Sequence, residues 1–369
     1  MTRTSIDVES LRGMLERGEP VTVLDVRPED QRTEWRIPGS LHFDAYGALK
    51  AKDPNAMEGA DVPEDRPVVT VCAAGNSSAV AAEQLRERGY EALTLEGGMK
   101  SWSLAWNAAE APVPGSEAGV IQVRRTGKGC LSYVVGSGGE AAVIDASLEP
   151  EIYLALAQER GWRIVNVLDT HVHADHLSRS KKLAELAGAT LRMPAGSPVS
   201  YRFSALGEGD ILEVGTARIE ALETPGHTPE STSYLLDGRA LFTGDTLFLE
   251  SVGRPDLGTT RAEAEKKARA LHGSLRRLLD LDPGTLVLPG HTSEPIPFDG
   301  EPVSAALAEV RENSPLLREG VEGFVERIAG RVPPAPENHE RIVELNRAGE
   351  LPEGDPTELE AGANRCAVG

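Results

Sequence analysis

Apolar and polar positions along the first third of the chain alternate between strand-like and helix-like patterns. Apolar, β-type runs occur at residues 21–26, 68–72 and 92–95. Between the last two runs, residues 79–89 carry apolar side chains at helical spacing and end in glycine, which indicates a short amphipathic helix. Strands that are apolar on both faces and separated by helices are typical of a small, mainly parallel sheet. The pattern therefore predicts an α/β unit here.

A break follows at residues 107–119, which are small and polar with two prolines and show neither the strand nor the helix period. Beyond this expected linker the pattern resumes. Strands are expected at residues 120–124, 130–135, 141–144, 164–168, 219–222, 233–236, 241–242 and 286–288. Helical spacing is found at residues 149–160, 261–279 and 340–346. The mixture predicts a second, larger α/β unit.

The chain length agrees with more than one domain. At about 150 residues per domain, 369 residues correspond to two or three domains. We expect a first domain at residues 1–110, a linker at 111–118 and a second domain at 119–300. Residues 301–369 are expected to form C-terminal helices and a tail. The predicted fold class is α/β, with a small parallel-sheet domain followed by a larger one.

Charge and cysteine content exclude several classes of partner and location. The sequence has 58 acidic against 38 basic residues, a formal net charge of −20, and such a field repels nucleic acid and anionic lipid surfaces. No apolar run approaches the length of a membrane span, and the first ten residues lack the apolar core of a secretion signal. Three widely spaced cysteines fit a reducing compartment. We therefore expect a cytoplasmic protein that binds neither nucleic acid nor membranes.

A cysteine stands where a buried strand gives way to a helix. Cys72 is followed by small residues: Ala73, Ala74, Gly75, Asn76 and Ser77. Such a loop can direct backbone N–H groups at the sulfur, and the helix dipole then favours a thiolate or an anionic persulfide. Gly75 allows the tight curl, and Ser77 or Ser78 can cap the helix. A buried structural cysteine is the alternative on burial statistics alone.

Three flanking motifs strengthen the functional interpretation of Cys72. They are residues 25–27 (DVR), 34–40 (EWRIPGS) and 97–102 (GGMKSW). With the cysteine loop they resemble a rhodanese, or sulfurtransferase, domain over essentially residues 1–110. The resemblance implies that Cys72 takes up sulfane sulfur as a persulfide. The loop lacks arginine and is one residue shorter than the related phosphatase loop, which argues against phosphate chemistry and leaves the sulfur donor open.

Histidine and aspartate residues cluster at the ends of strands expected in the second unit, several of them beside glycines that permit close backbone approach. These residues are His171, His173, Asp175, His176, His227, Asp245 and His291. Five of the eight histidines belong to this set, which argues against scattered surface positions. Imidazole and carboxylate ligands suit zinc, iron or manganese. The sequence therefore predicts a metal site.

The histidine motifs, in this order, resemble the metallo-β-lactamase fold, an αββα sandwich with metals at one edge, over roughly residues 118–300. Hydrolases, nucleases and oxygenases share this fold, so it does not define the reaction. Residues 247–256 (LFLESVGRPD) resemble a segment of persulfide dioxygenases of the ethylmalonic-encephalopathy type. The sulfurtransferase-like first unit points the same way, because fusions of the two domains form a recognised bacterial group.

The resemblance to persulfide dioxygenases implies one Fe²⁺ per chain, held by His171, His227 and Asp245. Two histidines and one carboxylate leave positions for dioxygen and a persulfide sulfur. The other four residues of the set would then orient ligands, bind water or shape the pocket. All seven residues can instead hold two Zn²⁺ bridged by Asp245, as in the glyoxalase II type. The spacing along the chain does not separate the two cases.

Three residues outside the ligand set have candidate roles of their own. Arg254 is a candidate for binding a carboxylate of the carrier thiol, with a salt bridge to Asp256 as the alternative. Which thiol serves as carrier is open, because the last histidine motif reads HTSE where relatives acting on glutathione persulfide often carry His-Asp-Tyr. Cys130 lies in a β-type run and is interpreted as a small buried hydrophobic residue. Cys366 is interpreted as unreactive, in a tail that can fold back on the body.

The sequence thus predicts a persulfide dioxygenase that oxidises a small thiol persulfide, such as glutathione persulfide, with O₂ to sulfite. The first domain would transfer sulfane sulfur through Cys72, with thiosulfate or sulfite as a partner. The resemblance also implies a homodimer. The alternative is a dizinc thioesterase of the hydroxyacylglutathione hydrolase type with an attached sulfur-carrier domain. A sulfur sensor or scaffold without catalysis is a third hypothesis, which the intact cysteine loop and ligand set disfavour.

Overall fold

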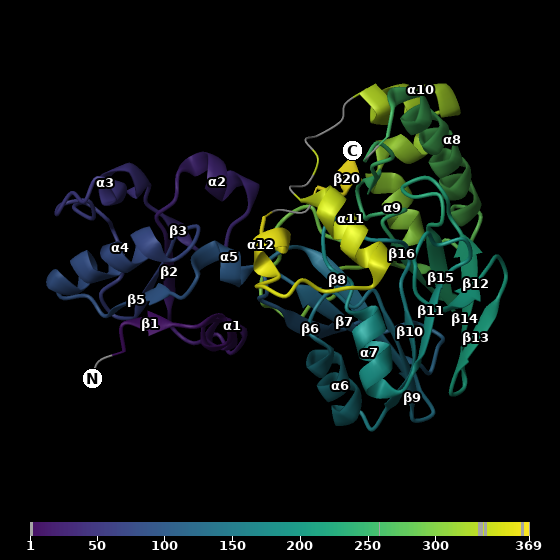
Figure 1. Ribbon diagram of the computed structural model, residues 1–369, viewed down its shortest axis with the longest axis horizontal. Coiled ribbons are helices and arrows are strands. Elements are labelled where there is room, and N and C mark those ends of the chain that lie inside the picture. The colour runs from purple at the N-terminus through teal and green to yellow at the C-terminus, as the bar shows by residue number, and fades with distance from the viewer. Residues whose placement is uncertain (1–2, 258, 331–334, 336–337, 363–364, 369) are drawn as a thin grey trace.

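The computed structural model describes residues 3–257, 259–330, 335, 338–362 and 365–368. The chain forms two units that lie side by side, a smaller N-terminal one and a larger one (Figure 1). The C-terminal segment, yellow in Figure 1, returns across the larger unit, and its helix α12 (Thr357–Glu360) contacts α5 (Gly98–Trp102) of the smaller one. The tail therefore lies at the junction of the two units.

The first unit is built on a parallel five-stranded sheet with the order β1-β5-β4-β2-β3. Its strands are β1 Ser5–Ile6, β2 Thr22–Asp25, β3 Leu41–His42, β4 Val68–Val71 and β5 Ala92–Leu95. In addition to α5, the first unit contains the helices α1 Val8–Glu16, α2 Glu29–Glu34, α3 Tyr46–Lys50 and α4 Asn76–Glu87. β2 and β4 are buried along their whole length, as their continuous apolar runs predict.

The second unit is a sandwich of a seven-stranded sheet, ordered β12-β11-β10-β9-β8-β7-β6, and a six-stranded sheet, ordered β13-β14-β15-β16-β18-β19. The first sheet contains β6 Asn107–Glu110, β7 Gly119–Arg125, β8 Cys130–Ser137, β9 Glu140–Ile144, β10 Arg163–Leu168, β11 Thr190–Pro194 and β12 Ser204–Leu206. The second contains β13 Ile211–Val214, β14 Ala217–Glu223, β15 Thr232–Leu236, β16 Ala240–Gly244, β18 Leu286–Pro289 and β19 Ala305–Ala306. Apolar side chains of both sheets pack between them, with the rings of Tyr133 and Phe242 4.8 Å apart.

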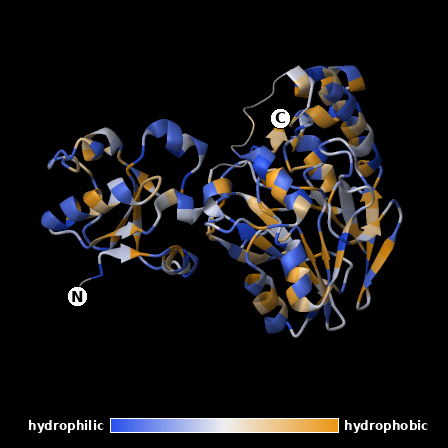
Figure 2. Ribbon diagram, in the orientation of Figure 1, coloured by the Kyte–Doolittle hydropathy of each residue, from blue (hydrophilic) through white to orange (hydrophobic). Residues whose placement is uncertain are grey.

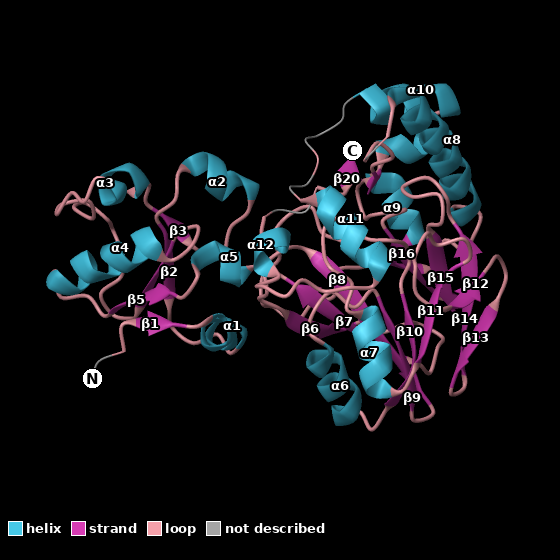
Figure 3. Cartoon of the chain, in the orientation of Figure 1, coloured by secondary structure: helices cyan, strands magenta, loops and turns pink. Residues whose placement is uncertain are grey.

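Helices cover the outer faces of the sandwich (Figure 3). On the seven-stranded sheet these are α6 Pro150–Glu159 and α7 Ser180–Ala187. On the six-stranded sheet they are α8 Arg261–Leu278, α9 Leu307–Asn313 and α10 Val321–Gly330, with a 3₁₀ turn at Pro315–Arg318. Figure 2 shows apolar residues along the strands and a mixture of apolar and polar residues on the helices, whose apolar side chains pack on the sheets. The αββα layering confirms the predicted fold class.

The expected C-terminal tail contains α11 (His339–Ala348), α12 and β20 (Ala367–Val368). Strand β20 pairs antiparallel with β17 (Val252–Gly253), so the tail folds back on the body as the sequence indicated. Residues 331–334, 336–337, 363–364 and 369 of this predicted region lie outside the described part. Among the helices that are described, none combines the length and the apolar content needed to cross a membrane.

A strand that the residue pattern does not predict lies at the start of the expected linker. Asn107–Glu110 forms β6, which pairs antiparallel with β7 at the edge of the seven-stranded sheet. Asn107 and Ala109 are buried, whereas Glu110 is exposed. Small and polar residues have low strand propensity, so pairing with β7 and not the local sequence determines the strand.

Candidate metal centre and cysteine loop

Strand ends of both sheets bring the predicted ligands to one end of the sandwich. His171 follows β10, Asp245 follows β16, His291 follows β18, and His227 lies in the loop between β14 and β15. β16 and β18 are neighbouring parallel strands, so Asp245 and His291 leave the sheet side by side. All four residues are buried. The topology explains why residues more than a hundred positions apart meet.

Two glycines permit this convergence. A Cβ on Gly253 would lie 1.8 Å from the carbonyl oxygen of Asp245, and one on Gly290 would lie 2.8 Å from its Oδ1. Real Cβ atoms do not approach so closely, so a side chain at either position would displace Asp245. Backbone packing therefore holds the carboxylate in place.

The structure brings His171, His227 and Asp245 together, with ligand atoms within 4.8 Å of one another. Asp245 Oδ2 lies 3.6 Å from His227 Nε2 and 3.9 Å from His171 Nε2. Both His171 Nε2 and Asp245 Oδ2 are buried without a hydrogen-bond partner. Buried polar atoms are rarely left in this state. The group therefore fits a bound cation.

Hydrogen bonds on the opposite side of each ring direct the Nε2 atoms at the shared carboxylate. His227 Nδ1 donates to the carbonyl oxygen of Arg254 at 2.8 Å. His171 Nδ1 donates to Thr170 Oγ1 at 2.9 Å, and that hydroxyl donates to Asp145 Oδ2 at 2.9 Å. Both Nε2 atoms then carry a lone pair, which is the tautomer a metal requires. This donor set fits Fe²⁺ or Zn²⁺.

His173 belongs to another donor group, although its ring centroid lies 4.3 Å from that of His171. Its Nε2 lies 3.2 Å from Asp145 Oδ1 and 3.9 Å from Asp169 Oδ1, and these three residues form a separate cluster. Asp145 also accepts a hydrogen bond from the backbone N–H of Thr170 at 2.7 Å. The Nε2 atom of His173 is therefore engaged by a carboxylate, whereas its Nδ1 atom is buried without a hydrogen-bond partner.

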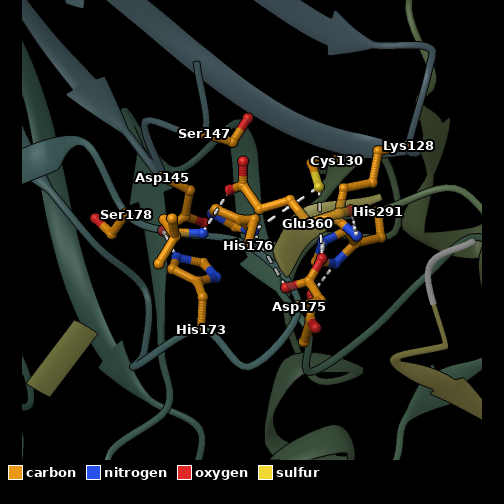
Figure 4. A network of polar contacts seen from close by, with 12 residues as sticks. Lys128, Cys130, Asp145, Ser147, His173, Asp175, His176, Ser178, His291 and Glu360 are labelled. Carbon is orange, nitrogen blue, oxygen red and sulfur yellow. Dashed lines mark hydrogen bonds and ion pairs between the residues drawn. The ribbon is translucent and has the colours of Figure 1, made fainter. Parts of the chain in front are cut away.

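A second donor group contains a cysteine. Cys130, Asp175, His176 and His291 have ligand atoms within 4.8 Å of one another. Cys130 Sγ lies 3.4 Å from Asp175 Oδ2 and 3.8 Å from His176 Nδ1, and Figure 4 shows the thiol and the carboxylate facing each other. Cys130 is buried in a strand as expected, but its thiol contacts polar donor groups and not apolar side chains alone. Its strand position is apolar by pattern, but its side chain faces the ligands that leave the strand ends.

His291 joins the two groups. Its Nδ1 donates to Asp245 Oδ1 at 2.5 Å. Its Nε2 lies 2.9 Å from Asp175 Oδ2, but the angles between the two groups are not those of a hydrogen bond. Burial opposes a charge on the ring, but the two carboxylates outweigh it and raise the pKa of His291 well above its usual range. A proton on His291 thus compensates the buried negative charge when no cation does so.

Burial and neighbouring charges also set the protonation of the other ligands. Burial lowers the pKa of His171 and of His227, which keeps both rings neutral at neutral pH. Burial alone would raise the pKa of Asp245, but the charge of His291 outweighs it and holds the carboxyl ionised. Burial likewise raises the pKa of Cys130, yet the nearby histidines lower it to about 7. The centre therefore offers neutral imidazoles, a carboxylate and an easily ionised thiol.

The tail reaches the same centre. Cys366 is buried and forms a third donor group with Asp245 and His291. The Arg254 guanidinium donates to both carboxylate oxygens of Asp256, at 2.9 and 2.7 Å, and to the carbonyl oxygen of Arg365 at 3.1 Å. The salt bridge expected as the alternative for Arg254 is thus present, and its role in substrate binding stays a prediction.

Two residues of the tail hold the backbone of the histidine motif. Asn346 Nδ2 donates to the carbonyl oxygens of His173 and His176 at 2.9 and 2.8 Å. Glu360 Oε1 accepts a hydrogen bond from the backbone N–H of Leu177 at 2.6 Å. Neither residue was predictable from the sequence, because their partners lie at least 170 positions away along the chain and only tertiary structure connects them.

In the first unit one backbone N–H near the start of α4 points at the sulfur of Cys72. Ser78 N–H donates to Cys72 Sγ at 3.3 Å, and a Cβ on Gly98 would lie 2.2 Å from the Cys72 carbonyl oxygen. Gly75 has a φ of 87° and occupies the cap position of α4. The expected capping by Ser77 or Ser78 is wrong, because α4 has no side-chain cap and Ser78 Oγ donates back to the Gly75 carbonyl.

A cavity of about 420 Å³ opens beside this loop, at the junction of the two units. The first unit contributes Ala73, Ala74 and Lys100 to its wall, and the tail contributes the segment around Glu358. Lys100 forms an ion pair with Glu358 across the opening. The volume suits a small molecule.

Comparison with known proteins agrees with the two-unit architecture. A model of the rhodanese-like domain matches residues 7–105, and a model of the metallo-beta-lactamase superfamily matches residues 125–291. A probable metallo-hydrolase of Burkholderia pseudomallei is 32% identical over 234 residues, which span 52% of this chain and 78% of that protein. A hydroxyacylglutathione hydrolase of Rhodospirillum rubrum is 34% identical over 198 residues, spanning 52% and 71%. The chain belongs to the metallo-β-lactamase superfamily and carries an N-terminal rhodanese-like domain.

Solved structures show the same architecture for the second unit. ETHE1 from Myxococcus xanthus superposes with a TM-score of 0.55 and 31% identity, covering 62% of this chain and 98% of that one. A metallo-beta-lactamase from Staphylococcus aureus gives a TM-score of 0.58 with 25% identity, covering 64% and 74%. The similar proteins thus include proteins that are named hydrolases and also ETHE1. Membership of the superfamily therefore does not define the reaction.

Proposed function

We propose that this protein is a persulfide dioxygenase fused to a sulfurtransferase. The observation that carries the proposal is the convergence of His171, His227 and Asp245, in which His171 Nε2 and Asp245 Oδ2 are buried without hydrogen-bond partners. Two histidines and one carboxylate with further positions open are the ligand set of non-haem iron oxygenases. The rhodanese-like domain and the likeness to ETHE1 support the same conclusion.

The residues of the centre have distinct roles in this reaction. His171 and His227 would hold Fe²⁺ through their Nε2 atoms, and Asp245 would contribute a carboxylate oxygen and one negative charge. When bound, the iron supplies redox chemistry with O₂ that side chains alone lack. Overall, the terminal sulfur of the persulfide is oxidised by O₂ to sulfite, one water is consumed, and the carrier is released as a thiol. Burial of the ligands excludes bulk water from the reacting sulfur.

In the first domain, the Cys72 thiolate would attack thiosulfate, displace sulfite and hold the sulfane sulfur as a persulfide. A carrier thiolate then attacks that sulfur and restores Cys72. The N–H of Ser78 stabilises negative charge on the sulfur. The cavity beside the loop is lined by charges of both signs, Arg27 and Lys100 with Glu34 and Glu358, and its volume admits a small thiol carrier such as glutathione. The cysteine domain can in this way supply persulfide to the metal centre.

A dizinc thioesterase is the second candidate, and one observation favours it. The group of Cys130, Asp175, His176 and His291 provides donors for another cation, and His291 connects it to Asp245. Relatives named hydroxyacylglutathione hydrolase support this alternative. Metal content and substrate together separate the two candidates.

Protein produced with adequate iron is expected to retain about one iron per chain, since the site offers one triad of histidines and carboxylate. With glutathione persulfide it is expected to consume O₂ and release sulfite in equal amounts, as an oxygen electrode and sulfite detection would show. Two zinc ions per chain, cleavage of a glutathione thioester and no O₂ uptake with several persulfides would establish the thioesterase instead.

Cys72→Ser is expected to abolish O₂ uptake that depends on thiosulfate plus glutathione, because the hydroxyl cannot carry sulfane sulfur. O₂ uptake with added glutathione persulfide serves as the internal control and is expected to continue, since the metal centre lies in the other unit. Both rates are measured on the same preparation. Unchanged thiosulfate-dependent uptake in the variant would show that the two domains do not cooperate.

A further inference from the structure

The position of the last described residues is fixed by the backbone of the second unit. Val368 and Ala367 pair with Val252 and Gly253 across β17 and β20. The backbone N–H of Arg254 donates to the carbonyl oxygen of Cys366 at 2.9 Å. Because β17 lies on the segment that follows Asp245, this pairing sets the tail directly against the ligand loop.

The side chain of Cys366 points into the donor cluster. It is 1% exposed, and its Sγ lies within 4.8 Å of ligand atoms of Asp245 and His291. Asp245 is also the carboxylate of the group with His171 and His227, so the thiol meets the residue at the middle of the centre. His171 Nε2, Asp245 Oδ2 and His291 Nε2 are all buried without hydrogen-bond partners.

These surroundings distinguish Cys366 from a cysteine that fills apolar space. A purely structural residue at this position would be expected among hydrophobic side chains, as buried cysteines commonly are. Instead the thiol shares its site with a carboxylate and an imidazole, both of which are ligand types. Imidazole, carboxylate and thiolate together are a donor set for thiophilic divalent cations.

We propose that Cys366 is a protein ligand of the metal held at Asp245, so that the C-terminal tail completes the centre with a thiolate. The cation is a divalent ion that accepts sulfur, such as Fe²⁺, Zn²⁺ or Co²⁺. The proposal concerns the ligand set and holds for the dioxygenase and the thioesterase alike. As a consequence, an incoming sulfur substrate must bind beside the thiolate of Cys366 or displace it.

The test uses the full-length protein loaded with Co²⁺. A thiolate bound to Co²⁺ gives an intense sulfur-to-metal charge-transfer band in the near ultraviolet, whereas imidazole and carboxylate do not. We expect this band in the wild type and in Cys72→Ser, and its loss when Cys366→Ser is introduced into Cys130→Ser, where neither thiol near the centre remains. Cys130→Ser is the matched control, because it removes the other thiol near the centre, and the band is expected to remain. The affinity of Cys366→Ser for Co²⁺ is expected to fall at least about tenfold.

A measurement that does not depend on the folding of Cys366→Ser is X-ray absorption of the zinc-loaded Cys130→Ser variant. A sulfur neighbour at about 2.3 Å from the metal is expected there, since Cys366 is then the remaining thiol of the donor groups. Absence of this neighbour, absence of the cobalt band in the wild type, or its survival in the double variant Cys130→Ser/Cys366→Ser would each overturn the proposal. None of these readouts requires O₂ consumption, so they succeed or fail independently of the proposed function.

Discussion

Asp245→Asn is expected to remove the metal from the second unit and abolish the activity of that unit. Asp245 belongs both to the group with His171 and His227 and to the group with Cys366. Asparagine keeps the shape but loses the negative charge that a buried divalent cation needs, and its amide N–H₂ cannot act as a ligand. Substitution of residues that merely orient ligands already lowers metal affinity about 10–100-fold, so we expect a loss of at least about a hundredfold here.

The measurement for Asp245→Asn is metal content per chain after dialysis, followed by O₂ uptake and thioester cleavage. Asp280→Asn is the matched control, because it makes the same chemical change outside the metal centre, just after α8. It is expected to bind metal as the wild type does. The histidine cluster also loses an anion in Asp245→Asn, so circular dichroism should establish that the variant is folded. Full metal retention by a folded Asp245→Asn would place the cation elsewhere.

The ligand cluster was predictable because the fold gathers residues that the sequence marks locally. His171, Asp245 and His291 each follow an apolar run closely, and the ends of neighbouring strands meet at one edge of a sheet. Cys72 was recognisable for the same reason, since a strand ends at it and a glycine-containing curl follows. In both cases a few residues that are adjacent in the sequence are enough to predict the site.

Features that depend on distant partners were not predictable. Cys130 has an apolar strand pattern around it, yet its side chain faces Asp175, which lies 45 positions further on. Cys366 meets Asp245 only because β20 pairs with β17. The strand β6 forms only because β7 offers an edge. The contact of His173 with Asp145 likewise joins residues 28 positions apart, so the local spacing does not predict it.

The contacts of the C-terminal tail join the two candidate sites. Asn346 holds the backbone of the histidine motif, Glu358 pairs with Lys100 beside the cysteine loop, and Cys366 meets the metal ligands. Between them, Glu360 contacts the guanidinium of Arg125, whose Nε donates to the carbonyl oxygen of Ser103 at the end of α5. One segment thus connects both candidate sites, and its attachment rests on the buried charge of Glu360.

Glu360→Gln is therefore expected to have the largest effect on stability. The carboxylate is fully buried and pairs with two buried guanidinium groups, those of Arg125 and Arg179. Lys128 Nζ also donates to its backbone carbonyl at 2.8 Å. Glutamine fills the same space but leaves two buried cations without their anion, and breaking a buried pair in this way costs about 3–5 kcal/mol in the free energy of unfolding. Urea denaturation at neutral pH measures the change.

The pH dependence of this loss identifies its cause. Burial alone would raise the pKa of Glu360, but Arg125 and Arg179 outweigh it and hold the pKa far below the ordinary value of 4.5. The stabilisation is therefore complete above about pH 4.5, the pKa in the unfolded chain, and declines as the pH falls towards the depressed pKa of the folded state. The difference in the free energy of unfolding between wild type and Glu360→Gln should narrow below that pH.

Glu358→Gln is the control. Glu358 is the exposed partner of Lys100, and its substitution should lower the free energy of unfolding by less than about 1 kcal/mol. Equal, small effects of both substitutions would show that the tail is not held by the buried carboxylate.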